Sequence, residues 1–98
     1  MEFIFEPELL EYMKQKGRNI IVQVAETHSD IEIQEIHVHL ISDKMADFYV
    51  SEKKYKVLQT PQARVLLPIY PLEYADKVVF GLKKFWIFKT ISFQGIGF

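Results

Sequence analysis

Two histidines separated by one residue are the best candidates for metal chemistry in this chain. His37 and His39 lie in the segment IEIQEIHVHLI at positions 31–41, where polar and apolar residues alternate. In a β-strand such residues project from the same face, about 7 Å apart at their bases, close enough to bind one ion. A zinc or nickel site needs three or four ligands, and His28 is the third candidate ligand. The alternative is that the histidines face solvent, because the apolar residues between them take the core face.

Residues suited to catalysis are sparse. The chain has no cysteine and three histidines. Ser29 lies beside His28, but sequence neighbours rarely form a productive nucleophile–base pair, and no glycine-framed nucleophile turn accompanies them. No phosphate-binding glycine pattern opens a helix. We therefore expect a protein that is not an enzyme, with no catalytic residue and no cofactor.

Lysines and aromatic residues are interleaved in KKFWIFK, residues 83–89. Residues 80–98 hold six of the fourteen aromatic residues and no acidic residue. Such a segment can stack on single-stranded nucleic acid or lie on an anionic membrane surface. In the interpretation that we favour, Phe85 and the rest of the segment complete the core. Trp86 and Phe88 are then the only candidates for an outward-facing interface, as expected for two residues of one strand face.

Length and composition indicate one globular domain over residues 1–98. Apolar residues make up 49% of the chain and charged residues 26%. A chain of this size buries about 60–65% of its unfolded surface, which is enough for one core. The lack of cysteine excludes disulfides and thiolate-bound clusters. With no signal-peptide pattern and no apolar run of about 20 residues, we expect a cytoplasmic protein without a membrane span.

Charge is divided unevenly along the chain. Residues 1–52 carry eleven acidic and four basic residues, whereas residues 53–98 carry two acidic and eight basic residues. A basic second half is compatible with an anionic partner. If the two halves lie side by side in the fold, these charges neutralise each other instead.

A helix and a series of short strands position these residues. We expect Pro7 to be the first residue of a helix whose apolar stripe covers residues 8–16 and which Gly17 ends, with acids early and lysines late. β-Branched residues predict a strand at 19–26, and the phase change within 31–41 predicts a bulge at residues 34–35. The other predicted elements are a turn at 27–30, a loop at 42–47, an ordered loop at 68–77, and strands at 3–5, 48–50, 55–59, 63–67, 78–82 and 90–93. We predict an α+β fold with one N-terminal helix packed on a mostly antiparallel sheet.

Three segments resemble a known family. They are LLEYMKQKGRNIIVQV at 9–24, RVLLP at 64–68 and LKKFWIFKTISFQGIGF at 82–98. Together they resemble the small HesB-like proteins, and most closely the subgroup with a cysteine–cysteine or cysteine–selenocysteine motif. The shared positions of the ending are Lys84, Phe85, Phe88, Lys89, Gly95 and Ile96. The resemblance implies a HesB-like fold, which is associated with iron–sulfur cluster biogenesis.

The chain differs from that family at the cysteines on which the chemistry of the family depends. The paired cysteines of the subgroup would fall near residues 27–30, where this chain has Thr-His-Ser-Asp. We therefore expect no iron–sulfur cluster, and a non-catalytic binding or scaffold domain whose partner is a second copy or another protein. Two alternatives are a metal-handling protein that uses His28, His37 and His39, and a single-stranded nucleic-acid-binding module, which we favour less.

Overall fold

The computed structural model describes residues 1–27 and 33–98, and these ranges contain two helices and seven strands. The α+β class predicted from the sequence is confirmed, with one more helix than expected. The elements are β1 (Glu2–Phe5), α1 (Pro7–Lys16), β2 (Asn19–Thr27), β3 (Ile33–Ile41), α2 (Asp43–Ser51), β4 (Tyr55–Gln59), β5 (Arg64–Pro68), β6 (Glu73–Phe85) and β7 (Phe88–Gly97).

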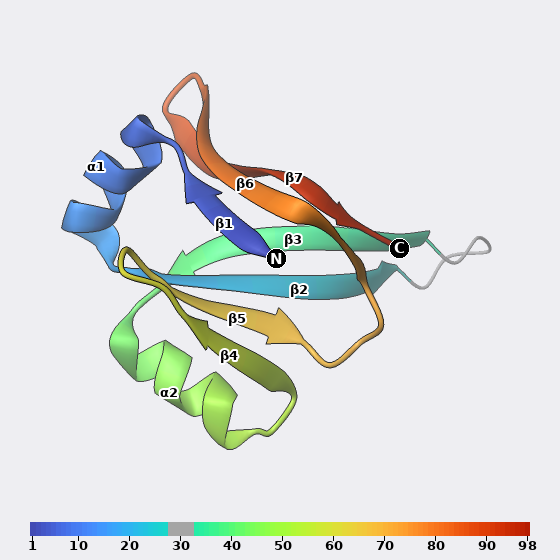
Figure 1. The fold of residues 1–98 in the computed structure, drawn as a ribbon. Coiled ribbons are helices and arrows are strands. Elements are labelled where there is room, and N and C mark those ends of the chain that lie inside the picture. Colours follow the sequence, from blue (N-terminus) through green and yellow to red (C-terminus); the bar gives the residue numbers. More distant parts are fainter. Residues whose placement is uncertain (28–32) are drawn as a thin grey trace.

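The strands form two sheets that face each other across the core (Figure 1). One sheet has the order β3-β2-β5-β4 and the other has the order β1-β6-β7. Three pairings are antiparallel, namely β2 with β3, β4 with β5 and β6 with β7. The pairings of β1 with β6 and of β2 with β5 are parallel. The prediction of mostly antiparallel pairing therefore holds, but the strands divide into two sheets instead of one.

The core lies between the sheets and is built by alternate residues of each strand. Ile20 and Val22 of β2, Val65 of β5, and Val78 and Phe80 of β6 have no exposed surface. Within each strand these residues are two positions apart, as expected for side chains that share one face of a sheet. Each sheet therefore presents one apolar face to the other.

Helix α1 closes one end of the sandwich, as the sequence predicts. Pro7 is in its first turn, where a missing N–H costs nothing. Leu9 and Met13, four residues apart, are buried against the core. Gly17 ends the helix with a φ of 119°, and its N–H donates to the Met13 carbonyl at 2.9 Å. Local signals were sufficient here because they all favour the same boundaries.

Helix α2 contradicts the predicted loop at 42–47 and the predicted strand at 48–50. The Ser42 Oγ accepts a hydrogen bond from the Met45 N–H at 3.2 Å and caps the helix. Ala46 is completely buried against the outer faces of β2 and β5. The segment is helical because a small residue lets it approach that second apolar surface, which the local pattern does not reveal.

A buried polar cluster joins α2 to the sheet beneath it. Asn19, which is 2% exposed, donates through Nδ2 to the Asp43 carboxylate at 2.7 Å. The Asn19 Oδ1 accepts from Arg64 Nε at 2.8 Å, and Arg64 also contacts Asp47 at 3.2 Å. Both ends of the Asn19 amide are satisfied, so the cluster has a structural role.

The bulge predicted at residues 34–35 is wrong. Every residue of β3 from Ile33 to Ile41 pairs with one residue of β2, from Thr27 back to Asn19. The predicted turn at 27–30 lies largely outside the described residues, since only Thr27 of it is described, in β2.

The irregular register occurs in β6 instead. Tyr74 pairs with Ile96 and Val79 pairs with Gln94, so β6 has three extra residues between these pairs. The loop predicted at 68–77 is accordingly too long, because β6 begins at Glu73. A strand interrupted in this way does not alternate regularly, which is why its pattern resembled a loop.

Candidate functional site

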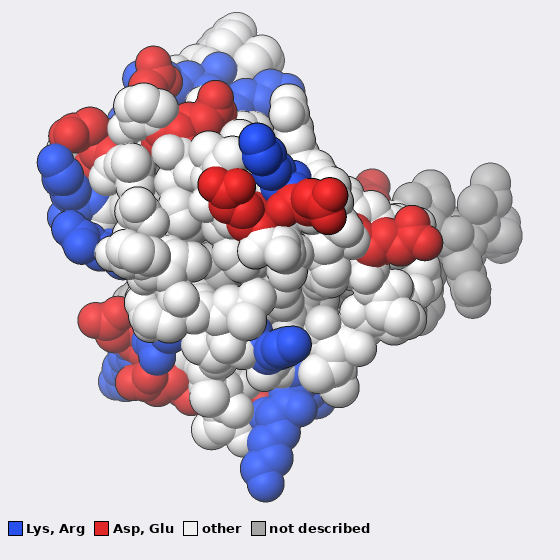
Figure 2. All heavy atoms as spheres, viewed as in Figure 1, with Lys and Arg blue, Asp and Glu red and all other residues white. Residues whose placement is uncertain are grey.

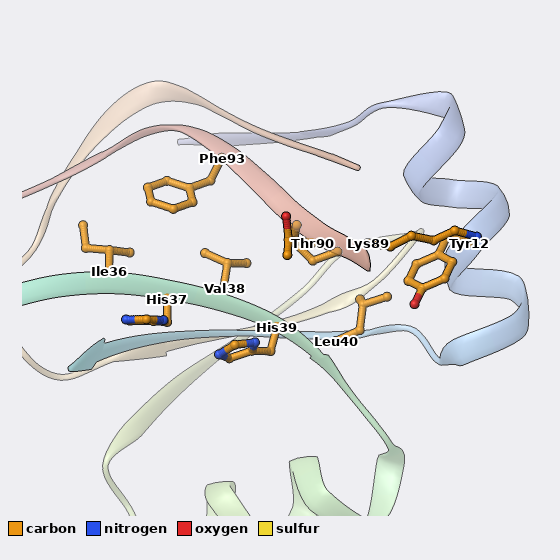
Figure 3. Close-up of a pocket in the computed structure, with 10 residues that line it drawn as sticks. Tyr12, Ile36, His37, Val38, His39, Leu40, Lys89, Thr90 and Phe93 are labelled. Carbon is orange, nitrogen blue, oxygen red and sulfur yellow. The ribbon is translucent and has the colours of Figure 1, made fainter. Parts of the chain in front are cut away.

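The two described histidines lie on the outer face of β3. Figure 3 shows both imidazole rings on the side opposite to Ile36 and Val38, which point toward β7. The ring centroids of His37 and His39 are 6.0 Å apart, and the planes are inclined by 23°. The His37 Nε2 lies 3.2 Å from the Glu35 carboxylate. The shared face predicted from the spacing is confirmed.

These groups do not form a metal centre within the described residues. No group of three or more histidine, cysteine, aspartate or glutamate side chains in residues 1–27 and 33–98 could hold an ion. Zinc requires three or four ligands, and His37 and His39 supply two. His28, the third predicted ligand, lies outside the described residues, as does Ser29.

A hollow of about 360 Å³ lies between the edges of β3 and β7, behind the histidines. It is lined on one side by Ile36 and Val38 and on the other by Thr90 and Phe93 (Figure 3). Tyr12, His37, His39 and Lys89 also line the hollow, so about half of its lining is polar. Within the described residues no two of these polar side chains are hydrogen-bonded to each other.

The most exposed apolar surface is the end of the β6–β7 hairpin. We call residues Phe85–Phe88 the hairpin tip. Phe85 and Phe88 form the last pair of the ladder and are 68% and 65% exposed. Trp86 and Ile87 form the two-residue turn and are each 89% exposed. In Figure 1 the tip extends beyond α1 and beyond both sheets.

The turn of this hairpin is built from residues that do not favour turns. Trp86 has a φ of 57°, in the left-handed region. Two-residue hairpin turns need positive φ values and normally use glycine or asparagine there. This conformation is less stable by about 1–2 kcal/mol for a residue that has a side chain. Strain of this kind is concentrated at functional sites.

Three lysines surround the hairpin tip. Lys84 lies directly opposite Lys89, and Lys83 lies directly opposite Thr90. Because successive residues of a strand face opposite sides, Lys83 and Lys84 place charge on both faces of the ribbon. The Lys89 Nζ is 5.1 Å from the centroid of the Tyr12 ring, on α1. None of the three lysines forms an ion pair with a described residue.

The prediction that residues 83–89 complete the core is therefore wrong. Phe85 is exposed instead of buried, and Trp86 and Phe88, the predicted interface residues, are exposed together with Ile87. The prediction assumed that side chains alternate between two faces of one continuous strand, but the chain reverses in a turn at Trp86. Ile87 was missed for the same reason. The only signal was the block of three lysines, since a core strand rarely carries so many charges.

The comparisons with known proteins are few. The sequence matches no protein-family model and no curated protein. The structure is similar to that of Escherichia coli SufA, a protein involved in the biosynthesis of iron–sulfur clusters. The two share 10% sequence identity over 96% of this chain and 80% of the SufA chain, with a TM-score of 0.48. At this level the similarity carries no argument about function.

An iron–sulfur cluster does not fit the residues that are present. Protein ligands of such clusters are thiolates, with histidine replacing some of them in one class. This chain has no cysteine, and its described residues bring together only two histidines. The expected absence of cluster chemistry therefore rests on the donor set.

No helix of the described residues is long and apolar enough to cross a membrane. Of the large apolar residues that are exposed in the described ranges, four are consecutive and form the hairpin tip. A turn of four large side chains can enter a hydrophobic environment without the rest of the domain. The hairpin tip is accordingly the candidate functional site.

Proposed function

We propose that this protein is a non-catalytic binding domain and that the hairpin tip is its contact surface. The observation that carries the proposal is the exposure of Trp86 and Ile87, each 89%, between two further exposed aromatic residues, Phe85 and Phe88. Large contiguous apolar patches on a folded domain are characteristic of interaction sites. A scattered exposed residue would need no such explanation.

The support for a role without catalysis comes from the same structure. The hydrogen bond that His37 makes is to Glu35, at 3.2 Å, and not to a hydroxyl nucleophile. The hollow between β3 and β7 is lined by polar as well as apolar side chains, and no two of the polar ones are hydrogen-bonded to each other in residues 1–27 and 33–98. The residues that stand out are apolar and cationic, which suits recognition of a surface more than reaction with a substrate.

A HesB-like origin of the fold is part of the proposal. Its support is the resemblance of residues 9–24, 64–68 and 82–98 to that family. In this view the domain has kept the framework and lost the thiolates, so its contacts define its role. Within that framework the predicted self-association or contact with another protein stays a prediction, as does its location in the cytoplasm.

Photo-crosslinking tests whether the hairpin tip is the contact surface. A benzophenone amino acid at position 87 is compared with the same amino acid at position 69, in cells that express the full chain. Ile69 is the matched control because it is an isoleucine that is 70% exposed, outside the hairpin. Benzophenone inserts into C–H bonds of proteins and lipids alike, so the comparison does not presuppose the partner. Adducts concentrated at position 87 are expected, and equal yields at the two positions would contradict the proposal.

A further inference from the structure

We propose that the hairpin tip docks on an anionic lipid bilayer, with Trp86 and Ile87 entering the interfacial region and the lysines facing the headgroups. This inference rests on the proposed function and names the partner of the same surface. The domain would lie on the membrane without crossing it, as amphipathic surface elements do.

The shape of the hairpin tip favours a bilayer. The turn is convex, and Figure 1 shows it extending past α1 at the end of the β6–β7 hairpin. A convex element that meets a protein needs a complementary pocket, whereas lipid adapts to its outline. Tryptophan is also the residue that concentrates at the level of the lipid headgroups.

The charge around the hairpin tip is complementary to anionic lipid. Lys83, Lys84 and Lys89 lie within two residues of the tip, on both faces of the ribbon. No acidic residue follows Asp76 in the chain. At the top of Figure 2, uncharged atoms extend outward above a band in which basic atoms lie beside acidic atoms. The lysines can therefore reach the headgroups while the apolar turn lies deeper.

Two acidic residues lie on one face of the hairpin. Glu8 and Glu11 of α1 line one shallow groove with Lys84 and Lys89. The acidic charge of α1 therefore lies beside these two lysines, next to the exposed turn and not within it. Lys83, on the other face of the ribbon, is not among the residues of that groove.

The area of the hairpin tip is small for a protein interface. Four large side chains of about 150–250 Å² each, exposed to this degree, supply about 600 Å². A standard protein–protein interface buries about 800 Å² per partner and usually more in a stable homodimer. A second copy would need further contacts, whereas a bilayer needs only the apolar turn and the lysines.

The hairpin also keeps local features that cost stability. Lys84 and Lys89 are like charges directly opposite each other, which destabilises a ladder. Trp86 occupies a left-handed conformation at a φ of 57°. An anionic surface would reduce the repulsion between Lys84 and Lys89. The left-handed conformation of Trp86 holds its indole at the apex of the turn. Sites that break several local rules at once are commonly functional.

Vesicle binding followed by Trp86 emission tests the inference, because Trp86 is the only tryptophan of the chain. The full chain is titrated with phosphatidylcholine vesicles that contain phosphatidylserine, and with pure phosphatidylcholine vesicles. A blue shift and co-sedimentation are expected with the anionic vesicles. Each lysine near an anionic surface strengthens binding about fivefold, so the three predict a preference of about 100-fold, reduced by salt.

Two variants and one control sharpen the test. Ile87→Glu should abolish the blue shift and the co-sedimentation, whereas the control Ile69→Glu should bind like the wild type. Replacing Lys83, Lys84 and Lys89 together with glutamine should remove the preference for anionic vesicles. Far-ultraviolet circular dichroism and thermal unfolding confirm that each variant is folded, which exposed positions should permit.

Other outcomes would overturn the inference. An unchanged Trp86 emission in anionic vesicles, or equal co-sedimentation of the wild type and Ile87→Glu, would exclude the bilayer. If the emission instead shifts with protein concentration or with added single-stranded oligonucleotide, the hairpin tip contacts protein or nucleic acid. In those cases the crosslinks at position 87 persist and the proposed function stands. If those crosslinks are also absent, both proposals fail.

Discussion

The part of the β6–β7 ribbon that pairs with β1, which we call its buried end, and the hairpin tip differ in what covers their apolar residues. Near β1, Phe80 is completely buried and stacks on Phe3 and Phe5, with ring centroids 6.0 Å and 5.8 Å apart. At the other end, Phe85 and Phe88 are paired across the same two strands and are 68% and 65% exposed. Aromatic side chains of one type are thus core at one end of the ribbon and surface at the other.

The difference lies in the neighbours of each end. The buried end is paired with β1 on one side and faces β2 and β5 across the sandwich. Beyond Leu82 the ribbon leaves the sandwich, and its neighbour there is α1, whose Tyr12 ring lies beneath Lys89. Exposure of an apolar strand end is therefore decided by how far the ribbon extends past its partners.

The largest expected effect is at the buried end. Phe80→Ala removes a completely buried ring and leaves a cavity, which should lower the free energy of unfolding by about 3–5 kcal/mol. Phe88→Ala removes the same ring from an exposed position and should change that free energy by less than about 0.5 kcal/mol. Urea unfolding of both variants measures the contrast. Similar losses would show that the hairpin tip is packed in solution.

A glycine at the buried end should have the next effect. Gly95 has a φ of 90°, and a Cβ built there would lie 2.5 Å from the Lys77 carbonyl oxygen. Gly95→Ala should lower the free energy of unfolding by about 2 kcal/mol, because it adds backbone strain to a steric clash. Gly97→Ala is the control, since a Cβ there has no described atom within 4 Å. Equal changes in melting temperature for the two variants would contradict the steric clash at Gly95.

Removal of one buried hydroxyl should stabilise the protein. The Tyr74 hydroxyl is buried without a hydrogen-bond partner among the described residues. Tyr74→Phe should therefore raise the free energy of unfolding by about 1 kcal/mol. Tyr70→Phe is the control, because the Tyr70 hydroxyl donates to Gln34 at 2.9 Å and its loss should slightly destabilise. A loss of stability in Tyr74→Phe would indicate a partner for that hydroxyl.

The same tyrosine predicts a dependence on pH. Burial raises the pKa of Tyr74 above its ordinary value of 10.0. The unfolded chain then ionises at a lower pH than the folded chain, so the free energy of unfolding falls as pH rises above 10.0. Tyr74→Phe lacks this contribution, and its advantage over the wild type should grow above that pH. An advantage that stays constant in alkaline chemical denaturation would contradict the burial of the phenol.

The smallest effect is expected at the turn of the hairpin tip. Trp86→Gly removes the left-handed strain without uncovering core, because Trp86 is 89% exposed. The greater freedom of glycine in the unfolded chain offsets part of this gain, leaving a rise of about 0.5 kcal/mol. Ile87→Gly relieves no comparable strain, so its free energy of unfolding should fall by a similar amount. If the denaturant midpoints of both variants shift in the same direction from the wild type, the turn is not strained at Trp86.

Local signals were enough where they agreed with one another. Pro7 and Gly17 mark the ends of α1, and the apolar residues between them lie on one face. The alternation around His37 and His39 correctly placed both rings on the outer face of β3. In each case the information lies within about ten residues, so no distant contact was needed to interpret it.

Features that depend on distant contacts were not predictable. Helix α2 buries Ala46 against Ile21 and Leu66, which are remote in sequence. Five of its nine residues are apolar, so composition did not distinguish this helix from the predicted strand. The aromatic residues of the hairpin tip have the composition of a core strand. Nothing in their spacing shows that the chain turns at Trp86 and carries them past the sandwich.

The sequence by itself determined the α+β class, the first helix, the inward faces of the main strands and the lack of thiolate chemistry. Periodicity and residue type are sufficient for these, because they are properties of single segments. The tertiary structure decided that there are two sheets, that a second helix covers one of them, and that the aromatic hairpin tip is surface. Burial depends on which distant segments meet, so only the assembled fold could separate the core end of the ribbon from its exposed end.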